Sequence, residues 1–151
     1  MNENAIRILE FINLFCVGLL AGLDFVVCYA VRGSIHALDE SSQIRIRQAL
    51  IRRLRILAPA LFFPAFISGL ILMIQNWGHG FTFHCAGVAA LIVWISITLT
   101  GTMPINKAVL DWNPDAPPGN WIELVERWER LDVVRTWVVM LAFAFFLIAA
   151  L

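Results

Sequence analysis

Residues 134–151 read VRTWVVMLAFAFFLIAAL, and no charged or amide side chain follows the second residue of this stretch. A helix that crosses a bilayer needs about 20 mostly apolar residues, because no water reaches its backbone polar groups in the hydrocarbon core. Three more stretches meet this requirement, at residues 5–31, 56–74 and 81–103. We therefore expect an all-α fold, a four-transmembrane-helix bundle that forms a single integral membrane domain over residues 1–151.

The composition agrees with a membrane protein. Of 151 residues, 60% are apolar and 15% are charged, and the mean hydropathy is +0.79. Soluble domains are roughly 45–50% apolar and about 25% charged, so a soluble enzyme, a nucleic-acid-binding protein and a disordered chain are all poor fits. The 11 basic residues balance the 11 acidic ones, which gives no global field to attract nucleic acid. The expected partners are the lipid bilayer and a lipophilic small molecule, while a homo-oligomer or a larger membrane complex is left open.

Basic residues are distributed very unevenly between the two sides of the expected bundle. Six arginines lie between the first and second stretches, three basic residues lie between the third and fourth, and Arg135 follows at the second position of the fourth. The opposite side carries Arg7 and an uncharged turn at residues 75–80. Because basic loops remain in the cytoplasm, we expect both long loops to be cytoplasmic and both termini outside, in the inner membrane if the source is bacterial. Trp77 and Trp121 stand where interfacial aromatic residues are expected.

Both cytoplasmic segments have the pattern of helix extensions. Residues 43–57 carry apolar side chains at roughly helical spacing among arginines, which predicts an amphipathic cytoplasmic helix leading into the second span. A proline-rich break at residues 115–119 precedes Asn120, a good N-cap residue, with Glu123 three positions later. The fourth helix should therefore begin near Trp121, in the cytoplasm, and run unbroken into the membrane.

Polar side chains within the spans need a physical reason, because a charge inside hydrocarbon costs roughly 2.5–3.5 kcal/mol on insertion scales. An advance of about 100° per residue along each helix places these side chains on narrow faces. Such faces must point toward other helices or toward a cavity rather than toward lipid. The aligned polar residues are Glu10, Asn13, Asp24 and Arg32 in the first helix, His84, Thr98, Thr102 and Asn106 in the third, and Trp128, Asp132 and Arg135 in the fourth.

Most of these polar residues reach a similar depth on the cytoplasmic side. One interpretation is a buried hydrogen-bonded network that fixes how the helices pack. The other is a polar pocket that binds and polarises a carbonyl or phenol-like substrate. The two interpretations are compatible, because a pocket needs a rigid polar wall. The candidate residues of this inner cluster are Asp24, Arg32, Thr98, Thr102, Asn106, Trp128, Asp132 and Arg135.

His84 is the only histidine inside an expected span, and it has two interpretations. It is either an interhelical histidine held by hydrogen bonds or a ligand of a haem cofactor. A two-histidine haem in a bundle needs facing histidines, whereas His36 lies in the cytoplasmic loop and His79 lies in the opposite turn. No His, Cys and carboxylate spacing typical of a metal site occurs, so we expect no metal.

Three motifs lie at the ends of the third and fourth spans. Residues 103–107 read MPINK, residues 112–114 read WNP, and residues 127–135 read RWERLDVVR. Together they resemble the anthrone oxygenase-like family, small four-span membrane proteins mostly of unknown function. The resemblance covers nearly the whole chain. Its most specific parts are the Pro-x-Asn of the first motif and, in the last, the Trp followed seven residues later by Arg.

The resemblance implies oxidation of an anthrone, a reactive polycyclic phenol, to its quinone by molecular oxygen without a metal or flavin cofactor. Such chemistry needs a base, hydrogen bonds to the developing oxyanion and a dry site. By matching positions, Asn106 and Arg135 would orient or stabilise the oxyanion, and Trp128 would line the aromatic pocket. Further candidates for substrate binding, taken from the inner cluster, are Arg32, Thr98 and Thr102.

Asp132 departs from the family pattern, which usually has His or Asn at this position. Like Asp24 it could act as a catalytic base if buried, or it could pair with Arg135 one helical turn later, and we favour pairing. Two classes of function therefore stay open. One is an oxygenase or oxidoreductase acting on a lipophilic phenol, anthrone or quinone, and the other is a non-catalytic membrane subunit or a protein that binds a lipophile or haem.

Overall fold

A computed structural model describes residues 2–75, 78 and 80–151, and these are helical apart from short turns and loops. Trp77 and His79, for which the sequence suggested an interfacial and a turn position, lie outside the described residues. The elements in chain order are α1 (Glu3–Val26), the π-helical segment η1 (Val27–Val31), α2 (Arg32–His36), α3 (Glu40–Gln75), α4 (Phe81–Ile97), the π-helical segment η2 (Thr98–Thr102), α5 (Met103–Asp111) and α6 (Trp121–Ala149).

The elements form four continuous helical rods, each long and apolar enough to cross a membrane: Glu3–His36, Glu40–Gln75, Phe81–Asp111 and Trp121–Ala149. The expected all-α fold with four spans is therefore confirmed. Each rod extends beyond the stretch that hydropathy alone marks, because helix continues through polar residues at the ends of the spans. The third and fourth rods are joined by a loop over residues 112–120.

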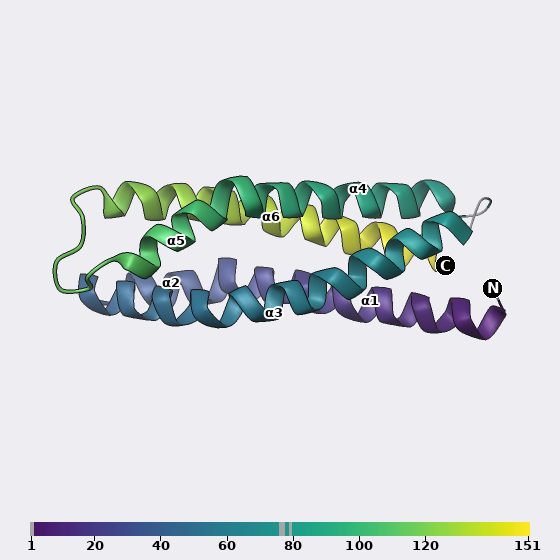
Figure 1. The fold of residues 1–151 in the computed structure, drawn as a ribbon, viewed down its shortest axis with the longest axis horizontal. Coiled ribbons are helices and arrows are strands. Elements are labelled where there is room, and N and C mark those ends of the chain that lie inside the picture. The colour runs from purple at the N-terminus through teal and green to yellow at the C-terminus, as the bar shows by residue number, and fades with distance from the viewer. Residues whose placement is uncertain (1, 76–77, 79) are drawn as a thin grey trace.

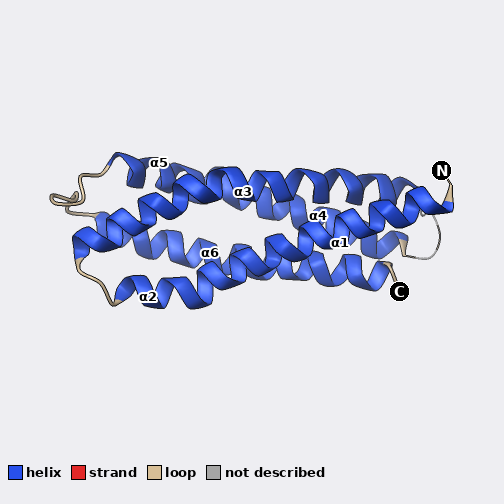
Figure 2. Ribbon diagram, turned by 90° about the horizontal axis from the view of Figure 1, so that it is seen from below, coloured by secondary structure: helices blue, strands red, loops and turns tan. Residues whose placement is uncertain are grey.

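The rods lie side by side in an elongated bundle (Figure 1). The first rod packs against the second and the fourth, and the third packs against the same two, so the first and third rods are diagonal. Both termini lie at one end, which we call the terminal end (Figure 1). The α2–α3 connection and the loop between α5 and α6 lie at the other, which we call the loop end (Figure 2). Both long connections thus share one end of the molecule.

The outer surface of the bundle is strongly apolar. Large side chains such as Phe11, Phe63 and Leu141 are more than half exposed, at 68%, 57% and 52%. A water-facing surface with so many exposed apolar groups along every rod would associate nonspecifically, whereas a bilayer solvates it. The chain is an integral membrane protein.

Glycines allow a close approach of three rods in the terminal half of the bundle. The Phe146 ring of α6 lies against Gly69 of α3 and Gly87 of α4, where an added Cβ would stand 2.8 Å from the ring in each case. Phe146 is itself buried, together with Leu91 and Val139. Small residues thus let the helices pack closely. Close packing matters in lipid, because no hydrophobic driving force brings the helices together there.

The two helices that begin at the loop end start differently. Asp39 caps α3, because its Oδ2 accepts hydrogen bonds from the Ser42 backbone N–H (3.1 Å) and the Ser41 hydroxyl (2.9 Å). Hydrogen bonding from the Ser42 side chain, and then from the Ser42 backbone N–H and the Ser41 hydroxyl, lowers the pKa of Asp39 to about 2. At α6 Asn120 occupies the expected N-cap position, but its side chain makes no capping bond. The helix still begins at Trp121, whose buried ring packs with Ile44 and anchors this end.

Candidate functional site

A cavity of about 450 Å³ lies in the loop half of the bundle, between all four rods. Its volume falls in the range of about 300–1,000 Å³ typical of pockets for small organic ligands. Most of the wall is apolar, with Ile51, Leu54 and Phe62 of α3 among the lining side chains. The lining residues Phe63 and Leu99 are also half exposed on the outer surface, so the cavity reaches the lipid-facing side between α3 and η2.

Both π-helical segments border this cavity. Val27 and Val31 of η1 line it from one rod, and Thr98 and Leu99 of η2 line it from another. A π-helical turn adds one residue to the α-helical repeat and locally widens the helix, and such turns occur frequently at functional sites. The irregular parts of two rods thus lie on either side of the same cavity.

Charged groups meet at the inner end of the cavity. The Arg135 Nη2 of α6 donates to Asp24 Oδ1 of α1 at 3.1 Å and to Asp132 Oδ1 at 2.9 Å. The Trp94 indole of α4 donates to the other oxygen of Asp24 at 2.8 Å. Buried charges are tolerated only when paired and hydrogen-bonded. Arg135 pairs with both carboxylates, and both oxygens of Asp24 accept a bond, whereas Asp132 Oδ2 has no hydrogen-bond partner among the described residues. The expected pairing of Asp132 with Arg135 is confirmed.

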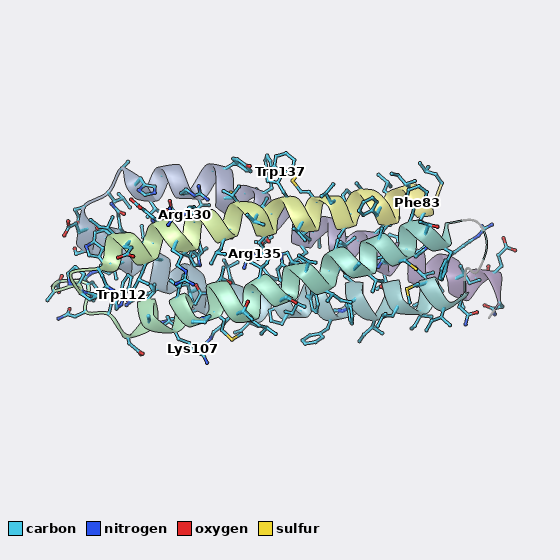
Figure 3. All side chains as sticks on the ribbon, turned by 90° about the horizontal axis from the view of Figure 1, so that it is seen from above. Phe83, Lys107, Trp112, Arg130, Arg135 and Trp137 are labelled. Carbon is cyan, nitrogen blue, oxygen red and sulfur yellow. The ribbon has the colours of Figure 1, made fainter. Side chains whose placement is uncertain are left out.

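Further contacts hold this network in place. The Thr136 hydroxyl donates to the Asp132 carbonyl oxygen at 2.8 Å and lies 3.4 Å from that of Asp24. The Arg135 guanidinium lies over the Trp94 ring, 5.3 Å from its centroid, in a cation–π contact. In Figure 3 Arg135 is directed toward the interior of the bundle. The network therefore connects three of the four rods at one depth.

A second network lies nearer the loop end and centres on Glu129 of α6. Glu129 Oε1 accepts from Arg47 Nη2 of α3 at 3.0 Å and lies 2.8 Å from His36 Nε2 of α2. Arg32 Nη2 donates to the Glu129 backbone carbonyl at 3.0 Å. The Arg47 guanidinium also lies 5.9 Å from the centroid of the Trp128 ring. One acidic side chain thus holds three basic side chains from two other rods.

Five residues of the cavity wall have buried polar atoms without a hydrogen-bond partner among the described residues. These atoms are Asn106 Oδ1, Trp128 Nε1, Arg32 Nε, Arg47 Nε and Arg135 Nε. Roughly nine in ten buried polar groups in proteins are hydrogen-bonded, so this concentration is unusual. Four donors and one acceptor in one apolar cavity are what a ligand with a few polar groups requires.

The structure places the sequence-predicted site residues in two groups. Six line the cavity: Asp24, Arg32, Thr98, Asn106, Trp128 and Arg135. Asp132 is completely buried, does not line the cavity and binds Arg135, which does. The Thr102 hydroxyl donates to the Thr98 carbonyl of its own helix at 3.2 Å, and it is also completely buried away from the cavity. Thr98 donates in the same way to the Trp94 carbonyl at 2.9 Å.

His84 lies at the terminal end, far along the bundle from this cavity. Its Nδ1 is 3.0 Å from the Gly80 carbonyl oxygen, and its ring makes an edge contact with Phe146. His36 lies at the loop end, so this pair of histidines cannot both ligate one haem iron. Within residues 2–75, 78 and 80–151, no group of three His, Cys, Asp or Glu side chains is placed to hold a metal ion.

Sequence reasoning missed three polar residues of the site. Trp94 was counted as apolar, although it lies three residues after the inward-facing Leu91 and four before Thr98. Arg47 is one of several arginines in the amphipathic segment of residues 43–57, none of which was a candidate site residue. Its spacing from the buried Ile44 would have placed it on the inward face of α3. Glu129 gave no such signal.

The fold and the cavity together define a class: a small integral membrane protein with four helical rods and a partly polar cavity open toward lipid. The family model described as anthrone oxygenase matches residues 48–145, and the chain belongs to this family. The match includes Asn106, Trp128 and Arg135 but not Asp24 or Arg47. No curated protein and no solved structure matches the chain.

Proposed function

We propose that the protein is an oxygenase that converts a lipophilic anthrone, or a closely related phenol, to the quinone with molecular oxygen inside the cavity. The observation that carries the proposal is an apolar cavity whose wall holds both a buried carboxylate, that of Asp24, and several unpartnered polar atoms. Membership of the anthrone oxygenase family supports the same reaction.

The reaction balances with oxygen as the only other reactant. An anthrone has a methylene carbon opposite its carbonyl, and this carbon becomes the second carbonyl of the quinone. One atom of O₂ enters the quinone and the other leaves as water with the two methylene hydrogens, so four electrons pass from substrate to oxygen. Removal of the first proton gives an electron-rich enolate that O₂ attacks to form a carbon-bound hydroperoxide. The second methylene proton then leaves as the O–O bond breaks, and it departs with the terminal hydroxyl group as the one water molecule, which completes the carbonyl.

Asp24 is the better candidate for the base that removes the first proton. It lines the cavity, whereas Asp132, the other candidate, does not. The bonds from Arg135 and Trp94 fix the direction of its oxygens. An anthrone is within the reach of a carboxylate base, because the resulting enolate is aromatic and can be stabilised by nearby donors.

The unpartnered atoms supply the remaining contacts. Arg135 Nε is a cationic donor next to Asp24, suited to the oxyanion that develops as the proton leaves. Asn106 Oδ1 is an acceptor suited to a phenolic O–H on the substrate. The Trp128 ring would lie along the aromatic face of the substrate. The apolar wall excludes water, which strengthens each of these interactions and protects the enolate from reprotonation by solvent.

The route by which substrate enters and the orientation of the protein in the membrane can also be proposed from the structure. A lipophilic substrate dissolved in the bilayer would enter past Phe63 and Leu99, the exposed apolar part of the cavity wall. We place the loop end in the cytoplasm because ten of the eleven basic residues lie in the half of the chain's helices and connections nearer this end. At 1.5 Å per residue α6 is about 43 Å long, more than the hydrocarbon thickness of about 30 Å. Its first turns, and those of α3, would then project into the cytoplasm.

Oxygen consumption by the purified protein with anthrone, measured against protein-free detergent, tests this function. We expect uptake of one O₂ per quinone formed at a rate well above the spontaneous one. A rate equal to that of protein-free detergent would exclude the proposal.

The second candidate is a non-catalytic membrane protein in which polar residues only fix helix packing. The position of Asp132 favours it, because this carboxylate is completely buried away from the cavity and still holds Arg135. In that case Asp24→Asn would lower the melting temperature without any associated oxygen chemistry.

A further inference from the structure

Positive charge is concentrated at the loop end of the cavity. The basic side chains in this part of its wall are Arg32, Arg47, Arg55 and Lys107. Glu129 holds the first two. Arg55 and Lys107 are exposed and form no ion pair with any residue that the structure describes. This end of an otherwise apolar cavity therefore carries cationic groups in excess of the carboxylate that holds them.

Arg47 is the buried member of this group, only 4% exposed. Its Nη2 is used by Glu129, but its Nε has no partner among the described residues, and neither does the neighbouring Trp128 Nε1. A cationic and a neutral N–H donor thus lie unused at the same end of the wall. Carboxylates and phenolates form their strongest hydrogen bonds with donors of this kind.

This end is separated from the proposed reaction centre by a distance that fits an extended aromatic molecule. Trp128 and Arg135 are seven residues apart on α6, which corresponds to about 10 Å along the helix axis. The α3 side chains Ile51 and Leu54 form apolar wall. Three linearly fused rings are comparable in length with this separation.

We propose that the natural ligand is a polycyclic aromatic carboxylate, whose carboxylate binds Arg47 Nε and Trp128 Nε1 while its oxidisable ring lies near Asp24. The inference rests on the proposed function for the position of the reacting ring and adds the class of substrate. Arg55 and Lys107 increase the attraction for the acidic group at the cavity edge. Arg47 thereby orients the ligand so that only one end of it approaches the base.

Two unreactive fluorescent probes of nearly equal shape test the inference: anthracene-2-carboxylate and 2-(hydroxymethyl)anthracene. Binding of each to the full chain in neutral detergent at pH 7 is measured by fluorescence titration. We expect the carboxylate to bind about tenfold more tightly or better, as one charge-assisted hydrogen bond predicts. Equal affinities in the unaltered protein would overturn the inference.

Variants locate the preference within the site. Arg47→Gln should abolish the preference for the carboxylate and leave the affinity for the neutral probe unchanged, which also shows that the variant is folded. Arg52→Gln is the matched control, since Arg52 is exposed on the same helix and outside the cavity wall. If Arg47→Gln does not fold, Lys107→Gln, an exposed substitution, should still reduce the preference. An unchanged preference in the folded variant would contradict the inference.

An acidic lipid headgroup could satisfy the same donors. Displacement of the carboxylate probe by phosphatidylglycerol but not by phosphatidylcholine would assign the site to lipid and overturn the aromatic ligand. Failure of this inference differs from failure of the proposed function. Oxygen uptake with neutral anthrone and no carboxylate preference would remove only the inference. A carboxylate preference without oxygen uptake would remove only the oxygenase.

Discussion

The Trp94 indole of α4 donates a 2.8 Å hydrogen bond to the Asp24 carboxylate of α1, across the diagonal of the bundle. These two rods otherwise pack mainly against α3 and α6. The bond therefore connects helices that few other contacts hold together. It also fixes the oxygen of Asp24 that does not bind Arg135.

Replacing Trp94 with Phe should destabilise the protein. The ring would keep most of its packing, but Asp24 Oδ2 would lose its donor, and an unsatisfied buried acceptor costs about 1–3 kcal/mol. We expect a lower melting temperature in detergent and a lower oxidation rate per folded molecule. Trp137→Phe is the control, because that indole bonds Tyr29 on the exposed surface. An equal effect of both substitutions would contradict a special role for Trp94.

Asp24→Asn and Asp132→Asn form a matched pair, because both carboxylates accept from Arg135 Nη2. Both substitutions should reduce stability through loss of a buried ion pair. Only Asp24→Asn should reduce kcat of the folded fraction, by roughly a hundredfold or more, because only Asp24 can reach the substrate. Rates normalised to folded protein check this. A similar loss of kcat for Asp132→Asn would mean that the base has been assigned wrongly.

Gly87→Ala should weaken the terminal half of the bundle. The added methyl group would stand 2.8 Å from the Phe146 ring, and overpacking of this kind costs about 1–3 kcal/mol. At Gly22 nothing lies within 4 Å of an added Cβ, so Gly22→Ala should be neutral or slightly stabilising. Thermal unfolding in detergent compares the two. Equal stability of both variants would show that this close approach does not limit packing.

The orientation can be read from thiol labelling in intact cells. Single cysteines at Asn4 and Asn113, exposed residues of the terminal end and the loop end, would be treated with a membrane-impermeant maleimide. Because the basic loops should be cytoplasmic, we expect Asn4→Cys to be labelled in intact cells and Asn113→Cys only after lysis. The unaltered chain, with three native cysteines, supplies the background. The reverse pattern would invert the proposed topology.

The fold was largely predictable, because in lipid the length of an apolar stretch and the need to satisfy backbone groups leave few alternatives. The depth of each polar residue along its helix also brought Asp24, Asp132 and Arg135 to one level. What helical spacing could not give was the direction of short side chains. Thr98 and Thr102 lie on the expected face, yet both hydroxyls bond to their own helix.

The sequence also could not show which of several similar residues is buried or forms a given contact. Several arginines precede the second span, and composition alone does not distinguish Arg47, which is buried, from Arg52, which is exposed. Glu129 became identifiable only when α2 and α3 were placed beside α6. Such contacts join residues far apart in the chain, so they depend on how the rods pack rather than on any local pattern.

The most direct test of the oxygenase is the fate of isotopically heavy O₂ supplied to the purified protein with anthrone. We predict that each quinone molecule gains one heavy oxygen atom, that the rate exceeds that of protein-free detergent, and that Asp24→Asn returns it toward that background. Quinone formation at the same rate with the unaltered protein, with Asp24→Asn and without protein would contradict the account.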